Sequence, residues 1–259
     1  MKNELIVAII QTDLVWENPK ANRDNIEHKV STIKDVDLIV LPEMFSSGFT
    51  MNASLVSETM NDETISWLKR LAKEKNAAFV GSLVILENHN YYNRLVFVEP
   101  SGKITQYNKR HTFTLAGEHN VYTAGNEKVI LNYKGWSICP LICYDLRFPV
   151  WARNTEDYDV LLYVANWPKV RIDAWDTLLK ARAIENMSYC IGVNRVGLDG
   201  NNYEYSGHSA AYNTLGHRID TIPKNKESIE IVTLEKVHIN KYRGKLGFLK
   251  DRDRFILKA

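Results

Sequence analysis

Residues Trp136 to Pro149 read WSICPLICYDLRFP, an apolar run followed at once by polar and turn-forming residues. The run from Trp136 to Ile142 predicts a buried β-strand, and the residues after it mark where that strand ends. Cys143 therefore stands at the rim of a sheet, where open α/β folds usually place their chemistry. A thiol in that place is a candidate nucleophile, provided that a neighbouring group takes its proton.

Strand-like and helix-like segments alternate on both sides of this run. Apolar runs predict further strands at 5–11, 38–41, 77–86, 93–99, 103–107, 128–131, 160–165, 190–196, 209–213 and 228–234. Helical spacing predicts helices at 19–34, 62–75 and 173–187, the last of them capped by Asp173. This alternation, without an internal linker or repeat, predicts one layered α/β domain over residues 1–259 with helices covering both faces of the sheet.

The composition is that of an ordinary globular protein. The chain has 259 residues, 45% of them hydrophobic and 25% charged, which is enough for one large domain with a substantial core. A formal net charge of +2 gives no electrostatic reason to expect nucleic acid or an anionic membrane as a partner. No apolar stretch approaches the length of a membrane-spanning helix. Three cysteines without a secretory signal indicate a reducing compartment, the cytoplasm, rather than a disulfide scaffold.

Three charged residues elsewhere in the chain are candidates to assist the thiol. Glu43 follows the predicted strand 38–41, and burial there would raise the pKa of its carboxyl and make it a better base, although a capping or surface glutamate is the commoner case. Lys109 follows the strand 103–107 and could stabilise an oxyanion, or belong to a solvated basic patch. Glu118 could orient that lysine or an attacking water, or be an exposed loop residue.

The cysteine itself has two competing interpretations. A free cysteine is most often a small buried hydrophobe, but the polar neighbours Tyr144 and Asp145 favour exposure at a rim. A metal site is not expected, because Cys139 and Cys143 would lie about 13 Å apart along one strand, too far to chelate one ion. Taken in the order Glu43, Lys109, Cys143, the chain supplies a base, a cation and a nucleophile, which are the groups that acyl transfer needs.

At these residues the sequence resembles the carbon–nitrogen hydrolase (nitrilase) superfamily, whose catalytic residues are a glutamate, a lysine and a cysteine in that order. The superfamily motifs appear as Leu41–Glu43, Asn108–His111 and Ile142–Pro149, and its additional glutamate matches Glu118, followed at the family spacing by Tyr122 and Gly125. A narrower resemblance is to bacterial members of the omega-amidase branch. It is carried by Glu43–Phe45, Ser47–Phe49, Leu162–Pro168, Ala181–Asn186 and Asn194–Gly197.

The resemblance implies a single-domain α-β-β-α sandwich that forms a homodimer, with residues 235–259 as a C-terminal extension at the dimer interface. It also implies a small-molecule amide substrate and no cofactor or metal. The activity implied is hydrolysis of the terminal amide of 2-oxoglutaramate and 2-oxosuccinamate to the 2-oxo acid and ammonia, through a cysteine thioester. Another amidase, a nitrilase or a carbamoylase of the same superfamily remains an alternative, as does a non-catalytic binding protein.

The same resemblance assigns roles to the residues of the motifs. Glu43 is expected to act as the base for Cys143. Lys109 and the backbone N–H of Tyr144 are expected to hold the oxyanion, and Glu118 is expected to position Lys109 or the substrate amide.

A 2-oxo acid also carries a carboxylate, which a guanidinium binds well. We expect Arg171 to hold it. Arg147 and Arg195 are alternatives, although a structural salt bridge is the more expected role of Arg147. Trp167 and Phe45 are expected to form walls of the pocket, although aromatic side chains at such positions are as often core.

Overall fold

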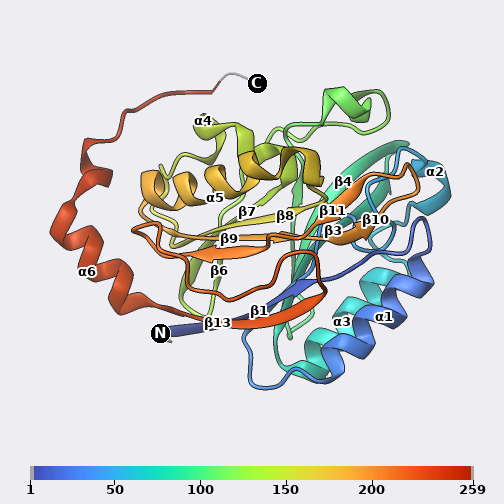
Figure 1. The fold of residues 1–259 in the computed structure, drawn as a ribbon, viewed down its shortest axis with the longest axis horizontal. Helices are drawn as coiled ribbons and strands as arrows, with labels where there is room; N and C mark the ends of the chain where they lie inside the picture. Colours follow the sequence, from blue (N-terminus) through green and yellow to red (C-terminus); the bar gives the residue numbers. More distant parts are fainter. Residues whose placement is uncertain (1–2, 258–259) are drawn as a thin grey trace.

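The computed structural model describes residues 3–257 and shows two β-sheets stacked between helices (Figure 1). The first sheet has the strand order β13-β1-β2-β3-β4-β5, and the second has the order β12-β9-β8-β7-β6. The strands of the first sheet are β1 (Glu4–Gln11), β2 (Leu38–Val40), β3 (Ala78–Glu87), β4 (Asn90–Val98), β5 (Ile104–Asn108) and β13 (Ser228–Glu235). Those of the second are β6 (Leu131–Tyr133), β7 (Trp136–Ile142), β8 (Val160–Ala165), β9 (Tyr189–Asn194) and β12 (Ala210–Tyr212). A short hairpin, β10 (Val196–Leu198) and β11 (Glu204–Ser206), follows β9.

The two faces of the first sheet follow from the period of two in its strands. In β1, Leu5, Val7 and Ile9 join the core shared with the second sheet, whereas Ala8 and Ile10 join a separate core under helices. Those helices are α1 (Pro19–Ser31) and α3 (Glu63–Lys75), which cover the outer face of this sheet (Figure 1). A strand buried on both faces needs apolar residues at nearly every position, which is what β1 provides.

The outer face of the second sheet is covered by α5 (Ile172–Asn186), which buries Trp175, Leu179 and Ala183 against the strands. The short helix α4 (Pro149–Ala152) lies on the same side, and α2 (Ala53–Val56) follows β2. The layers are therefore helix, sheet, sheet, helix. This confirms the expected α-β-β-α sandwich.

Strand directions bring four chain segments to one edge of the sandwich. β7 and β8 are parallel, and β2 is parallel to β3. β5 is antiparallel to β4, which is antiparallel to β3, so β5 also runs in the direction of β2. Glu43, Lys109, Cys143 and Asn166 all lie within three residues of the carboxyl end of one of these strands. The candidate site is built at that edge.

Several local predictions differ from the structure. The strand expected at 190–196 ends at Asn194, and Val196 begins the hairpin strand β10. The strand expected at 128–131 is found at Leu131–Tyr133, where it can pair with β7 through the turn before Trp136. Helix α5 is preceded by a 3-10 turn, Lys169–Arg171, and begins at Ile172. Its N-cap is therefore Arg171, without a side-chain bond, and Asp173 lies inside the first turn, where a carboxylate still interacts favourably with the helix dipole.

The C-terminal part of the chain runs along the outside of the sandwich (Figure 1). β13 pairs with β1, and α6 (Lys236–Leu246) then packs on the body through the buried side chain of Ile239. Arg243 of α6 donates to the backbone carbonyls of Met187 and Tyr158. No helix within residues 3–257 has the length and apolar character needed to span a membrane.

Candidate active site

Cys143 is the first residue of a 3-10 turn, Cys143–Arg147, that directly follows β7. Its φ of 42° lies in the left-handed region, which is uncommon for a residue other than glycine and recurs at functional sites. The side chain is only 9% exposed, so the thiol is less accessible than its polar neighbours indicated. Burial, and then the charge of nearby Glu43, raise the pKa of the Cys143 thiol well above its ordinary value. Since the resting thiol is therefore protonated, it needs a base.

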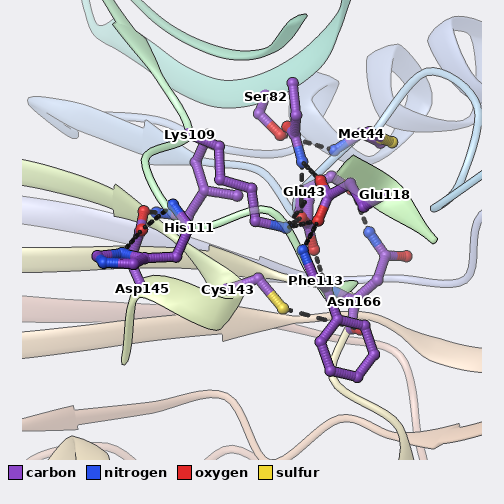
Figure 2. Close-up of polar contacts among 12 residues, drawn as sticks. Glu43, Met44, Ser82, Lys109, His111, Phe113, Glu118, Cys143, Asp145 and Asn166 are labelled. Carbon is purple, nitrogen blue, oxygen red and sulfur yellow. Dashed lines mark hydrogen bonds and ion pairs between the residues drawn. The ribbon is translucent and has the colours of Figure 1, made fainter. Parts of the chain in front are cut away.

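Lys109 lies between two carboxylates. Its Nζ is 2.9 Å from Glu43 Oε1 and 3.0 and 2.9 Å from the two oxygens of Glu118 (Figure 2). All three side chains are at most 1% exposed. Burial alone would lower the pKa of Lys109, but the charges of Glu118 and Glu43 outweigh it and raise that pKa above its ordinary value. Lys109 is therefore a fixed cation shared by two anions.

Backbone and amide N–H groups hold the two carboxylates. Glu43 Oε2 accepts from the backbone N–H of Asn166 at 2.8 Å, and Glu118 Oε2 accepts from that of Phe113. The side-chain amide of Asn93 donates to Oε1 of both glutamates, at 2.8 and 3.2 Å. Burial raises the pKa of Glu118, and the charge of Lys109 opposes that rise. These contacts fix the orientation of both acids.

Asn93 and Asn166 were not singled out from the sequence. The available signal was an amide placed at the edge of an apolar run: Asn93 opens the predicted strand 93–99, and Asn166 closes the strand Val160–Ala165. Both are buried, and a buried amide must find hydrogen-bond partners. What the sequence could not show is that these partners would be the two acids.

Asp145 joins the two loops that carry Lys109 and Cys143. One of its oxygens accepts from the backbone N–H of His111 at 3.0 Å and lies 2.8 Å from the ring nitrogen of that residue. The other accepts from the hydroxyl of Tyr107 at 2.8 Å and from the backbone N–H at position 142 at 3.0 Å. The ring of His111 also stacks on Phe148, with centroids 3.6 Å apart. Hydrogen bonds of Asp145 thus join the motif Asn108–His111 to the motif Ile142–Pro149.

A cavity of about 480 Å³ opens above the thiol. Glu43, Lys109 and Cys143 line it, but Glu118 does not. Glu118 therefore contacts the ammonium group of Lys109 from the protein interior and not from the cavity. Tyr144 lines the cavity beside the cysteine.

Two arginines, Arg147 and Arg171, line the same cavity. Arg171 lies over the ring of Phe113, at 5.2 Å, and Arg147 over the ring of Trp167, at 4.9 Å. Neither forms an ion pair with any residue between 3 and 257, so Arg147 does not make the structural salt bridge expected of it. Each guanidinium group lies over an aromatic ring, and a contact of this kind does not use its hydrogen-bond donors.

The third candidate, Arg195, is fully buried outside the cavity. Its guanidinium bonds Asp13 at 2.6 Å and the carbonyls of residues 14 and 198. It holds the segment after β1 against the hairpin that follows β9.

Only one of the two aromatic residues that were expected to line the pocket does so. Trp167 lines the cavity, and its indole N–H donates to the carbonyl of Arg171 at 2.8 Å. Phe45, expected as a second wall, lies instead in the core under α1 and α3, completely buried and 6.2 Å from the ring of Trp67. Its ring fills the space above Gly81, where any Cβ would lie 2.7 Å from it. The chain turns at Met44, with a φ of 41°, so the side chain two residues after Glu43 points back into the protein.

The chain matches known proteins along nearly its whole length. The family model "Carbon-nitrogen hydrolase" matches residues 6–243. The chain is 43% identical over 253 residues to omega-amidase YafV of Escherichia coli K12, covering 98% of each chain. It is 34% identical over 216 residues to the 2-oxoglutaramate amidase of Bacillus subtilis, covering 81% of this chain and 83% of the relative.

The fold has a close match among solved structures. XC1258 of Xanthomonas campestris, a CN-hydrolase superfamily protein with an arsenic adduct in its active site, superimposes with a TM-score of 0.97 at 38% identity. The match covers 99% of this chain and 100% of that one. Taken with the family match over most of the chain, it shows that this protein belongs to the carbon–nitrogen hydrolase family.

Proposed function

We propose that this protein is an omega-amidase, which hydrolyses the terminal amide of 2-oxo dicarboxylic acid monoamides such as 2-oxoglutaramate and 2-oxosuccinamate. One observation carries the proposal: a buried thiol with a carboxylate and an ammonium lies in a cavity that also contains two arginines without ion pairs among the described residues. The acyl-transfer groups fit an amide, and the arginines fit the carboxylate of an oxo acid. The names of the relatives support the same activity.

In the first half of the reaction, Glu43 takes the proton of Cys143 as the sulfur attacks the amide carbon. The negative charge that develops on the amide oxygen is held by Lys109 and the backbone N–H of Tyr144. Removing one donor of this kind typically costs about a hundredfold or more in rate. Glu43, now protonated, gives its proton to the leaving nitrogen. Ammonia departs and the acyl group remains on Cys143 as a thioester.

In the second half, Glu43 takes a proton from water as that water attacks the thioester carbon. The thiolate leaves, recovers the proton, and the 2-oxo acid is released. Glu118 lies outside the cavity, so we assign it to holding Lys109 rather than the substrate amide.

Substrate orientation is assigned to the arginines. Arg171 binds the carboxylate that lies at the far end of the substrate from the scissile amide, and Arg147 lies in the same cavity as a second cation. Trp167 forms a wall and holds Arg171 through its indole N–H. No step in this mechanism uses a metal or a cofactor.

A reducing compartment such as the cytoplasm fits this chemistry. The proposed nucleophile must be a free thiol, and Cys139, Cys143 and Cys190 are all unpaired. A thioester-forming cysteine would be lost if it were oxidised to a disulfide.

The test is release of ammonia from 2-oxoglutaramate by the wild-type protein and by Cys143→Ala. The variant should fold, with an unchanged melting temperature, and lose turnover completely, because no other described thiol reaches the cavity. Glutamine, asparagine and a simple aliphatic nitrile should be poor substrates for the wild type. Near-normal turnover by Cys143→Ala would remove this cysteine as nucleophile, and a preference for the nitrile or an uncharged amide would replace the omega-amidase assignment with another activity of the family.

A further inference from the structure

We propose that Asn93 is a positioning residue, which keeps Glu43 and Glu118 in place while Lys109 turns one of its hydrogen bonds toward the oxyanion. The inference rests on the roles proposed above for Glu43, Lys109 and Cys143. Asn93 belongs to β4, is 1% exposed and does not line the cavity. It therefore acts through the charged groups and not on the substrate.

Lys109 has no spare donor in the resting site. An ammonium group has three N–H donors. Its three contacts, at 2.9, 3.0 and 2.9 Å, go to one oxygen of Glu43 and both oxygens of Glu118. To bind an oxyanion beside Cys143, Lys109 must release one of these carboxylate oxygens at the moment when charge develops on the substrate.

Asn93 donates to two of the three oxygens that Lys109 contacts. Its amide N–H groups reach Glu43 Oε1 at 2.8 Å and Glu118 Oε1 at 3.2 Å. Within residues 3–257, Lys109 and Asn93 are the two N–H donors to each of these oxygens. The opposite oxygens have backbone partners in Asn166 and Phe113. When Lys109 releases either Oε1, Asn93 is the N–H donor that remains.

The orientation of the Asn93 amide is fixed by these contacts. Both partners are carboxylates and can only accept, so the NH2 group must face them. The amide oxygen then points away and is buried without a partner among the described residues. The backbone carbonyl of Asn93 also accepts the backbone N–H of Lys109 at 3.0 Å. Asn93 thus fixes both the main chain of Lys109 and the two acids around its ammonium.

Removal of the Asn93 amide should act on the chemical step. In Asn93→Ala we expect kcat to fall by about tenfold to a hundredfold, less than for a donor that touches the oxyanion itself, with KM nearly unchanged. Loss of two donors to the carboxylates disfavours their ionised form. The acidic limb of the kcat/KM profile should therefore move to higher pH.

The experiment compares Asn93→Ala, Asn93→Ser and Asn154→Ala. Serine keeps one donor and should recover part of kcat. Asn154 is a matched control, because it is also buried and donates both amide N–H groups, but to the carbonyls of Tyr158 and Asn186 outside the cavity. Asn154→Ala should lower the melting temperature and leave kcat and the pH profile as in the wild type.

The same variants are also treated with iodoacetamide across a pH range, with alkylation of Cys143 followed by mass spectrometry. This readout needs no substrate, so it tests Asn93 even if 2-oxoglutaramate is not hydrolysed. In Asn93→Ala and Asn93→Ser the alkylation profile should also move to higher pH. The proposal is overturned if folded Asn93→Ser matches the wild type in both profiles, or if the Asn93 variants differ from Asn154→Ala only in melting temperature.

Discussion

Burial disfavours the thiolate of Cys143, which is why the proposed mechanism gives this thiol a base. The cost of desolvation is the largest contribution to its raised pKa, followed by the charge of Glu43, and the charge of Lys109 opposes both. In other proteins a catalytic cysteine has a lowered pKa and is already a thiolate before the substrate binds. In the proposed mechanism the proton leaves as the sulfur attacks, so Glu43 and the thiol would act together.

This dependence predicts a pH profile for Glu43→Gln. With the base removed, alkylation of Cys143 by iodoacetamide requires the free thiolate, whose pKa burial keeps high. The alkylation rate should therefore be low at neutral pH and continue to rise with pH beyond about 9.5, one unit above the ordinary thiol pKa of about 8.5, where the alkylation of an ordinary thiol levels off. Peptide mapping separates Cys143 from the fully buried Cys139 and Cys190. A plateau below that pH would show that Glu43 is not the group that controls the thiol.

Replacement of Arg171 tests its proposed contact with the substrate carboxylate. A hydrogen-bonded charged group contributes about 1.5 to 3 kcal/mol, so Arg171→Met should lower kcat/KM for 2-oxoglutaramate by roughly ten- to a hundredfold, mostly through KM. An uncharged short amide should be affected little. Arg147→Met is the matched comparison, because both arginines line the cavity and stack on an aromatic ring. If Arg171→Met lowered kcat/KM equally for 2-oxoglutaramate and for the uncharged amide, Arg171 would not be the residue that binds the carboxylate.

At the scale of the elements, the site depends on how closely the segment around Gly125 approaches the end of β5. The N–H of Gly125 donates to the carbonyl of Lys109 at 2.8 Å. A Cβ at Gly125 would lie 2.2 Å from the carbonyl oxygen of Asn108, which no side chain tolerates. The glycine therefore sets the position of the main chain that carries Lys109.

Gly125→Ala should separate these two segments and displace Lys109. A misplacement of about 1 Å costs on the order of a hundredfold in rate, and we expect kcat to fall by that order together with the melting temperature. Gly244→Ala is the control, because a Cβ there meets nothing within 4 Å and alanine is the better helix former within α6. That variant should be as active as the wild type and slightly more stable. Full activity in Gly125→Ala would mean that the loop relaxes without moving Lys109.

Periodicity placed most of the main strands and helices, and the strand ends marked Glu43, Lys109 and Cys143 as candidates, whose roles came from the family resemblance. The apolar runs ending at Ile142 and Ala165 are strands with those bounds, because a strand buried on both faces shows as continuous apolar sequence. Glu43 and Lys109 meet because β2 and β5 run in the same direction within the first sheet. Cys143 follows a strand of the second sheet, so its place beside them depends on how the two sheets stack. The strand ends depend on local sequence, but the stacking does not.

Contacts between residues distant in sequence could not be predicted in the same way. The bond between Glu43 and Asn166 joins the two sheets and residues 123 apart in sequence, and that between Glu43 and Asn93 lies within the first sheet but joins residues 50 apart. The direction of Phe45 depends on the left-handed turn at Met44, which no residue preference indicates. Side-chain direction after a strand end and pairing across the sandwich are set by tertiary packing.

At the scale of the molecule, we propose that this protein forms a homodimer. Exposed apolar side chains occur on the helical layer over the second sheet, at Val150 of α4 and Ile184 of α5, and on the C-terminal segment, at Phe248 and Ile256. The C-terminal segment contacts the connection between α4 and β8, where Arg252 pairs with Asp157. Pairing of two such faces would extend the sandwich across the interface and cover these side chains.

The expected mass by light scattering after size-exclusion chromatography is therefore twice the 29.8 kDa of one chain. Ile184→Arg places a charge at the centre of the proposed interface, where it would be desolvated, and should shift the population toward monomer. Leu55→Arg is the control, because Leu55 is also an exposed apolar residue, but on α2 far from this layer (Figure 1). A monomeric wild type, or a dimer that both substitutions leave intact, would place the interface elsewhere or remove it. If the dimer does dissociate, the activity of the Ile184→Arg monomer shows whether one chain alone completes the site, as the placement of Glu43, Lys109 and Cys143 on a single chain predicts.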